Sequence, residues 1–201
     1  MARRISDGAW SGPTHPLHTS NPLLKTANDR IPSSLSLHTA ALAEPLSVVL
    51  QAFKRAQIAP ASKVLILGAG AVGLLTCSLA KASGCTTVIA VDIEQGKLDF
   101  AKEMGWATGI HLLPKGPRCS GADALEVAKS SWEGLRDSEV FKGVLGLEDG
   151  FDVVLECTGV ESCMQMAVMV SPSSPFSFSF SFPLPLSTHN LIFDHSSRAN
   201  K

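Results

Sequence analysis

Residues 63–73, K-V-L-I-L-G-A-G-A-V-G, decide the fold of this chain. The first five residues form a continuous apolar run of strand length, which is typical of a strand covered on both faces. Glycines then recur with the spacing G-x-G-x-x-G, and the apolar residues that follow have helical spacing. This order predicts a strand, a tight turn and a helix whose first turn faces an anion.

Each glycine of the turn has a separate expected role. Gly68 permits the tight turn, Gly70 lets the backbone approach a pyrophosphate, and Gly73 lets the helix pack closely on the strand. The free N–H groups of Ala71 and Val72, together with the helix dipole, would face the pyrophosphate.

An aspartate at the end of the next apolar run completes the pattern. Asp92 follows Gly73 by 19 residues, where a dinucleotide-binding unit places the carboxylate that hydrogen-bonds the adenosine ribose. A carboxylate also repels a 2′-phosphate, by about 1 to 4 kcal/mol at 4 Å, so we expect NAD to bind better than NADP. Lys97 either reaches the same ribose or is a solvated surface lysine.

The alternation of elements continues on both sides of this unit. Apolar runs predict strands at 63–67, 87–91, 109–112 and 151–155. Helical spacing predicts helices from Pro45, from 74, over 95–104, over 123–132 and from Glu161. Strands alternating with helices give an α/β fold: a Rossmann-type parallel sheet with right-handed crossovers and helices on both faces, over residues 31–170.

The flanks differ from this domain. Residues 1–30 show neither strand nor helix periodicity, and residues 171–201 contain a Ser/Phe/Pro-rich low-complexity run. Prolines around the Ser/Phe alternation confine it to a sheet edge or to disorder. We therefore expect irregular tails on a truncated domain, with the strand at 151–155 left as an open edge through which a second chain, identical or not, could pair.

Composition excludes several classes of function. A net charge of −1 is too small for a basic nucleic-acid binder. The uncharged stretch 162–193 contains four prolines, which argues against a membrane span, and no apolar run follows the N-terminal arginines as in a signal peptide. Five cysteines without a C-x-x-C pair indicate neither a disulfide framework nor a zinc ribbon. We expect a cytoplasmic protein.

Two other cofactor classes fit the sequence less well than a nicotinamide dinucleotide. A methyltransferase would carry an acidic residue just before a G-x-G-x-G loop, but Leu67 occupies that place here and the third glycine falls one residue later. A flavoprotein usually has its glycine turn near the N-terminus of a much longer chain. Both rank below NAD.

Four strings give the chain a family resemblance: I-P-S-S-L-S-L-H-T-A-A-L-A-E-P-L-S-V, V-L-I-L-G-A-G-A-V-G-L-L, V-I-A-V-D-I and F-D-V-V-L-E-C-T-G-V-E-S. Residues 29 to about 169 resemble the nucleotide-binding domain of zinc-dependent medium-chain alcohol dehydrogenases. The likeness is greatest to the polyol branch, which includes sorbitol, xylitol and arabinitol dehydrogenases.

The resemblance implies NAD-linked hydride transfer from a secondary alcohol of a small polyol, with zinc polarising the oxygen. It places Ile93 beside Asp92 in the pair typical of NAD-linked members, and it places Cys157 and Thr158 beside the cofactor. Glu44 corresponds to a glutamate that contacts zinc or its water, and is otherwise a helix N-terminal acid. The family's zinc-binding Cys and His belong to a preceding domain that these 201 residues do not match. We therefore expect nucleotide binding without a catalytic residue, or alternatively a non-catalytic nucleotide-binding or interaction module.

Overall fold

The computed structural model describes residues 3–4, 30–116, 119–143, 150–170, 178–181 and 193–194. These residues fall into two compact units, Met1–Glu44 and Pro45–Lys201. In the first unit, β1 (Arg3–Arg4) pairs antiparallel with β2 (Arg30–Ile31), and α3 (Leu37–Ala40) follows. Most of the segment 1–30 that we expected to be irregular lies outside the described residues, and the domain boundaries at 30 and 170 stay predictions.

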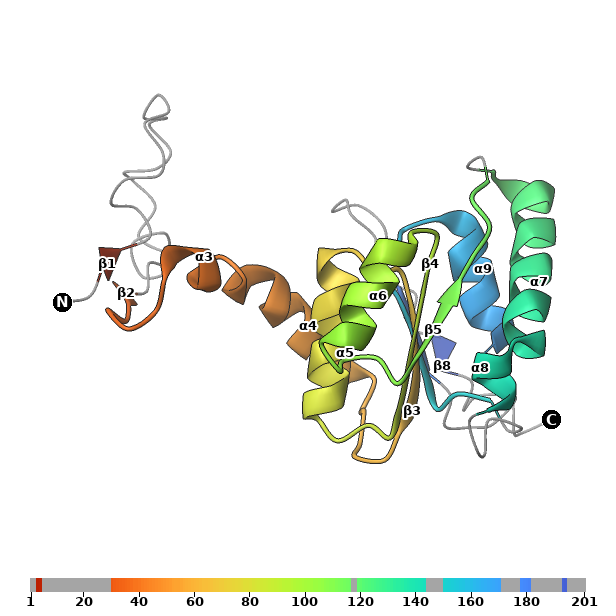
Figure 1. The fold of residues 1–201 in the computed structure, drawn as a ribbon. Helices are drawn as coiled ribbons and strands as arrows, with labels where there is room; N and C mark the ends of the chain where they lie inside the picture. The colour runs from red at the N-terminus through yellow and green to blue at the C-terminus, as the bar shows by residue number, and fades with distance from the viewer. Residues whose placement is uncertain are drawn as a thin grey trace, which may run out of the picture. The chain divides into compact units, whose positions relative to one another are not determined.

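The second unit is built on a parallel sheet. Its first four strands are β3 (Lys63–Leu67), β4 (Thr87–Asp92), β5 (Gly109–Leu112) and β6 (Val153–Glu156). They pair in the order β5-β4-β3-β6, all parallel, so the first strand in sequence lies at the centre (Figure 1). This order, with the crossover reversing direction beside β3, confirms the predicted Rossmann-type α/β sheet.

Helices cover both faces of the sheet, as predicted (Figure 1). Their bounds are α4 (Ala43–Arg55), α5 (Ala71–Ala82), α6 (Gln95–Glu103), α7 (Gly121–Asp137), α8 (Glu139–Lys142) and α9 (Glu161–Val170). Helix α7 is one turn longer than its predicted end at Trp132. Among the described residues, no helix has the length and apolar content needed to cross a bilayer.

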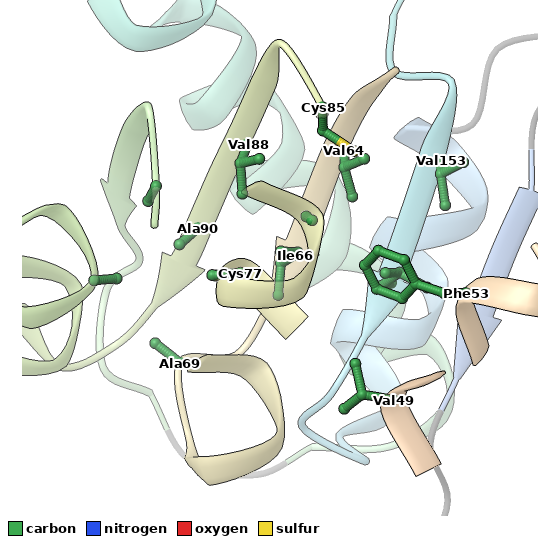
Figure 2. Packing of buried hydrophobic residues seen from close by; sticks show 14 of the residues in the cluster. Val49, Phe53, Val64, Ile66, Ala69, Cys77, Cys85, Val88, Ala90 and Val153 are labelled. Atoms are coloured by element: carbon green, nitrogen blue, oxygen red, sulfur yellow. The ribbon is translucent and has the colours of Figure 1, made fainter. Parts of the chain in front are cut away.

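Strict alternation along the strands divides the core in two. Val64 and Ile66 of β3 face α4, α5 and α6, where they meet side chains such as Phe53 and Cys77 (Figure 2). Leu65 and Leu67 point the other way, against α7 and α9. Because both faces of a parallel strand are buried in this arrangement, a continuous apolar run is needed rather than an alternating one.

The short helix α8 packs on the second core through aromatic rings. Phe141 lies edge-on to Trp132 of α7, with ring centroids 5.5 Å apart, and to Phe151, at 5.9 Å. The hydroxyl of Ser138 accepts a hydrogen bond from the Phe141 N–H and caps this helix. No role is predicted for this segment from the sequence. In the structure its Phe141 ring packs against Phe151, just before β6 begins.

The expectation of an open edge at the fourth strand is wrong. Strand β7 (Phe178–Ser181) pairs parallel with β6, from Val153 opposite Phe178 to Glu156 opposite Ser181, and β8 (Phe193–Asp194) pairs antiparallel with β7. The prolines at 175 and 183 flank this strand and do not interrupt it, so every ladder donor within it is retained. The rest of the Ser/Phe/Pro run lies outside the described residues.

Burial of β3 predicts how a leucine truncation acts. Leu65 is fully buried at the centre of the sheet, whereas Leu112 of β5 is 47% exposed. We expect Leu65→Ala to lower the free energy of unfolding by about 2 to 5 kcal/mol, because it leaves a cavity, and Leu112→Ala to lower it by less than about 1 kcal/mol. Urea denaturation of both variants measures this; equal losses would contradict the assignment of β3 to the core.

Candidate functional site

The carboxyl ends of β4, β3 and β6 are tied together by main-chain hydrogen bonds. The Gly68 N–H donates to the carbonyl of Val91 at 2.7 Å, and the Cys157 N–H donates to the carbonyl of Leu67 at 2.8 Å. These bonds hold the turn after β3 between the ends of its two neighbours. Parallel α/β sheets bind ligands at this position, where the strand order reverses.

The glycines of the turn differ in what surrounds them. A Cβ on Gly73 would lie 1.8 Å from the carbonyl oxygen of Gly68, so helix α5 touches the end of β3 backbone to backbone. Gly68 has a φ of +99°, and a Cβ there would lie 2.7 Å from Cγ2 of Thr158. Among the described residues, none has an atom within 4 Å of a Cβ on Gly70. The fold therefore requires glycine at 68 and 73, while the described residues leave open space at Gly70.

The N-terminus of α5 opens beside that space. Gly70 is its N-cap residue, and among the described residues no side chain caps the helix. Gly70 and Ala71 are exposed and Val72 is half-buried. A helix start with available N–H groups and the positive end of its dipole is suited to a phosphate, and the arrangement therefore fits the pyrophosphate of a dinucleotide.

Asp92 turns toward the glycine turn. Its Oδ2 accepts a hydrogen bond from the Ala69 N–H at 2.6 Å, and its Oδ1 accepts one from the Glu94 N–H at 2.9 Å. A carboxylate has about four acceptor positions, so Asp92 keeps capacity for hydroxyl donors. Two main-chain hydrogen bonds thus fix the Asp92 carboxylate beside the glycine turn.

The residues that follow Asp92, from Ile93 to Lys97, are exposed. Ile93 is 45% exposed. Nζ of Lys97 lies 3.4 Å from Oε2 of Glu94, and both side chains are close to half exposed. Of the two roles considered for Lys97, the structure thus gives an exposed lysine with an acidic neighbour; contact with a ribose stays a prediction.

A buried glutamate that the sequence analysis did not single out organises the end of β6. Glu156 is fully buried. Its carboxylate accepts hydrogen bonds from the Thr158 N–H at 2.6 Å, from the Thr158 hydroxyl, and from the Gly159 N–H at 3.1 Å. The sequence signal was present: a single carboxylate at the end of an otherwise apolar strand, before T-G.

Cys157 lies beside the glycine turn. Its Sγ is 3.9 Å from Oγ1 of Thr76, and its Cβ is 3.7 Å from the position of a Cβ on Gly73. Burial raises the pKa of the Cys157 thiol far above its ordinary value, and burial raises the pKa of Cys77 on α5 to about 12. Both thiols are therefore neutral at pH 7 and act as small apolar side chains rather than nucleophiles.

The predicted metal residue is not part of a metal site in the described part of the chain. Glu44 lies in the first turn of α4, where a negative charge interacts favourably with the helix dipole and stabilises the helix. No three His, Cys, Asp or Glu side chains among the described residues are grouped so that they could hold a metal ion. Catalytic zinc needs three protein ligands, so these residues alone do not fit the metal.

The fold is a Rossmann-type α/β domain with a candidate ligand site at the carboxyl ends of β3, β4 and β6. A family model described as zinc-binding dehydrogenase matches residues 71–171, half of the chain. The chain belongs to this zinc-binding dehydrogenase family, whose polyol dehydrogenase-like members it resembles in sequence, and the predicted resemblance is confirmed.

Two curated relatives are D-xylulose reductases. The D-xylulose reductase A of Aspergillus niger is 38% identical over 141 residues, and that of Aspergillus oryzae is 36% identical over 141 residues. Each match covers 70% of this chain but 35% of the relative, so the chain spans about a third of their length.

A solved structure shows the same likeness. A protein from Sinorhizobium meliloti 1021, described as a zinc-binding dehydrogenase and crystallised with NADP, superposes with a TM-score of 0.58 at 26% identity. The superposition covers 81% of this chain and 42% of that protein.

Replacement of single glycines shows which of them the stability of the fold requires. Gly73→Ala forces α5 off β3, and we expect it to lower the free energy of unfolding by about 3 kcal/mol or more. Gly70→Ala enters empty space and should change it by less than about 1 kcal/mol. Chemical denaturation without ligand measures both; a loss at Gly70 as large as that at Gly73 would contradict the described geometry.

The buried thiol on α5 predicts an alkaline loss of stability. Cys77 stays neutral in the folded chain up to pH about 12, whereas in the unfolded chain it ionises near its ordinary value of 9.0. Its stabilising contribution is present below pH 9 and is lost as the pH rises toward 12, by about 1.4 kcal/mol per pH unit.

The sequence contains no tyrosine to obscure this titration. Urea denaturation between pH 9 and 10.5 should show a shallower decline for Cys77→Ala than for the unmodified chain. An unchanged slope would mean that this thiol ionises in the folded protein.

Proposed function

We propose that this chain binds NAD through its ADP half at the carboxyl ends of β3 and β4. The observation that carries the proposal is the exposed start of α5, which no described side chain caps, next to the Asp92 carboxylate, which accepts a hydrogen bond from the Ala69 N–H. In this fold a dinucleotide is recognised by a glycine turn, by the N-terminus of the helix that follows it, which binds the phosphates, and by an acidic residue that binds the ribose.

Each residue of the proposed site has a defined task. The N–H groups of Ala71 and Val72 bind pyrophosphate oxygens, Gly70 admits them, and Asp92 accepts hydrogen bonds from the ribose hydroxyls. Cys157 and Thr158, at the end of β6, border the other half of the dinucleotide. When bound, NAD supplies a hydride acceptor.

The charges near Asp92 support NAD over NADP. A 2′-phosphate on the ribose would face the Asp92 carboxylate, with the Glu94 carboxylate two residues on. Lys97, a cation of this region, already has Glu94 as a neighbour at 3.4 Å. Although the relative from Sinorhizobium meliloti was crystallised with NADP, the carboxylates here oppose a further negative charge.

We propose, for the whole protein, NAD-linked hydride transfer from a secondary alcohol of a small polyol. The D-xylulose reductases among its relatives support this substrate class. Because the described residues do not fit zinc, no step through the metal is assigned to them. Their contribution is to bind and orient the cofactor. A cytoplasmic location stays a prediction, whereas assembly through an open edge at β6 is not proposed, because β7 pairs with that strand.

The rival function is a nucleotide-binding or interaction module without turnover. NADH production from sorbitol or xylitol, measured together with zinc content, separates the two. Turnover with stoichiometric zinc supports the dehydrogenase, whereas NAD binding without turnover supports the module.

Thermal melts with either cofactor test the nucleotide site. At a hundred times its dissociation constant a ligand stabilises the folded chain by about 2.7 kcal/mol. We expect NAD to raise the melting temperature more than equal NADP does. Asp92→Asn keeps the side-chain shape but removes the charge, so it should narrow this difference.

Asp99→Asn is the matched control, because Asp99 is an exposed carboxylate on α6 that accepts a hydrogen bond from the Gln95 side chain at 2.7 Å. It should leave both shifts unchanged. Equal shifts by NAD and NADP in the unmodified chain would refute the role of Asp92, and no shift by either would refute nucleotide binding.

A further inference from the structure

The fully buried carboxylate of Glu156 accepts hydrogen bonds from one short turn. Burying an ionised carboxylate is costly unless hydrogen bonds replace its hydration. Here hydrogen bonds come from three donors on two nearby residues: the N–H and hydroxyl of Thr158 and the N–H of Gly159. The carboxylate therefore determines the path of the chain as it leaves β6.

The same contacts fix the side chain of Thr158. Its hydroxyl donates to Glu156 and accepts a hydrogen bond from the Val160 N–H at 3.0 Å, just before α9 begins. With the hydroxyl held at both sides, its methyl Cγ2 is directed at Gly68, where it lies 2.7 Å from the position of an added Cβ. Glu156 thus joins the turn after β6 to the glycine turn after β3.

The position of this turn in the sheet decides which part of a ligand it serves. Strand β4, with Asp92, lies on one side of β3, and β6, with Glu156, lies on the other. A dinucleotide whose pyrophosphate lies at the start of α5 and whose adenosine ribose lies at Asp92 must extend its second half toward the end of β6.

We propose that Glu156 is a positioning residue for the nicotinamide half of the cofactor, acting through Thr158 and Gly159. This inference rests on the proposed nucleotide site and deepens it. Glutamine cannot substitute well, since its NH₂ group would oppose the N–H donors of the turn, whereas a carboxylate presents acceptors only.

The test compares two ligands that share the ADP half. Dissociation constants of NAD and ADP are measured by calorimetry on the full chain, unmodified and with Glu156→Gln. We expect about tenfold weaker binding of NAD and a change of less than twofold for ADP. Glu161→Gln, an exposed carboxylate on α9 that accepts a hydrogen bond from the Gly121 N–H at 3.0 Å, should leave both constants unchanged.

Thr158→Val provides a second variant if the buried substitution prevents folding. It keeps the methyl group that faces Gly68 and removes the hydroxyl that links Glu156 to Val160. NAD should again weaken more than ADP, by several-fold. A merely structural role would instead lower the ligand-free melting temperature and move the two dissociation constants together, or move neither, and either result would overturn the proposal.

Binding of ADP and NAD to the unmodified chain distinguishes failure of this proposal from failure of the proposed nucleotide site. Failure to bind ADP would refute the nucleotide site itself. Binding of ADP with no further gain for NAD would leave that site intact and overturn the role of Glu156.

Discussion

The contact between α5 and β3 is the constraint on which the rest of this site depends. With hydrogen in place of a side chain at Gly73, the helix approaches so closely that a Cβ would lie 1.8 Å from the carbonyl oxygen of Gly68. This approach brings the start of α5 to the end of the central strand. The free N–H groups of the first turn are therefore presented at the one edge of the sheet where the chain ends of β3, β4 and β6 meet.

Two carboxylates at that edge are used in opposite ways. Asp92 ends β4 half-buried, with one main-chain donor on each oxygen and capacity to accept more. Glu156 ends β6 fully buried, where it accepts hydrogen bonds from the adjoining turn. The same functional group thus keeps acceptor positions for the proposed ribose contact at one strand end and organises the backbone at the next, and the two positions differ in solvent access rather than in chemistry.

The sequence predicted the central sheet well because its signals are local. The run at 63–67 and its neighbours at 87–92 and 109–112 are short apolar segments bounded by glycine or aspartate, and their strand limits follow from the residues themselves. The glycine spacing likewise predicted the turn. What could not be predicted depends on contacts between distant segments: the pairing of β7 with β6 and the rings that hold α8 over Phe151. A zinc role for Glu44 came from resemblance alone, and no metal-binding group in the described chain supports it.

The empty space beside Gly70 has a consequence for how such a chain would change over generations. Gly73 is required for folding whether or not a nucleotide is ever bound, so selection for a stable polypeptide alone preserves it. No described residue lies within 4 Å of a Cβ on Gly70. A lineage that no longer binds a ligand here could therefore replace Gly70 without loss of stability. A descendant in which Gly70 is replaced while Gly73 is unchanged would therefore have kept the fold and lost cofactor binding.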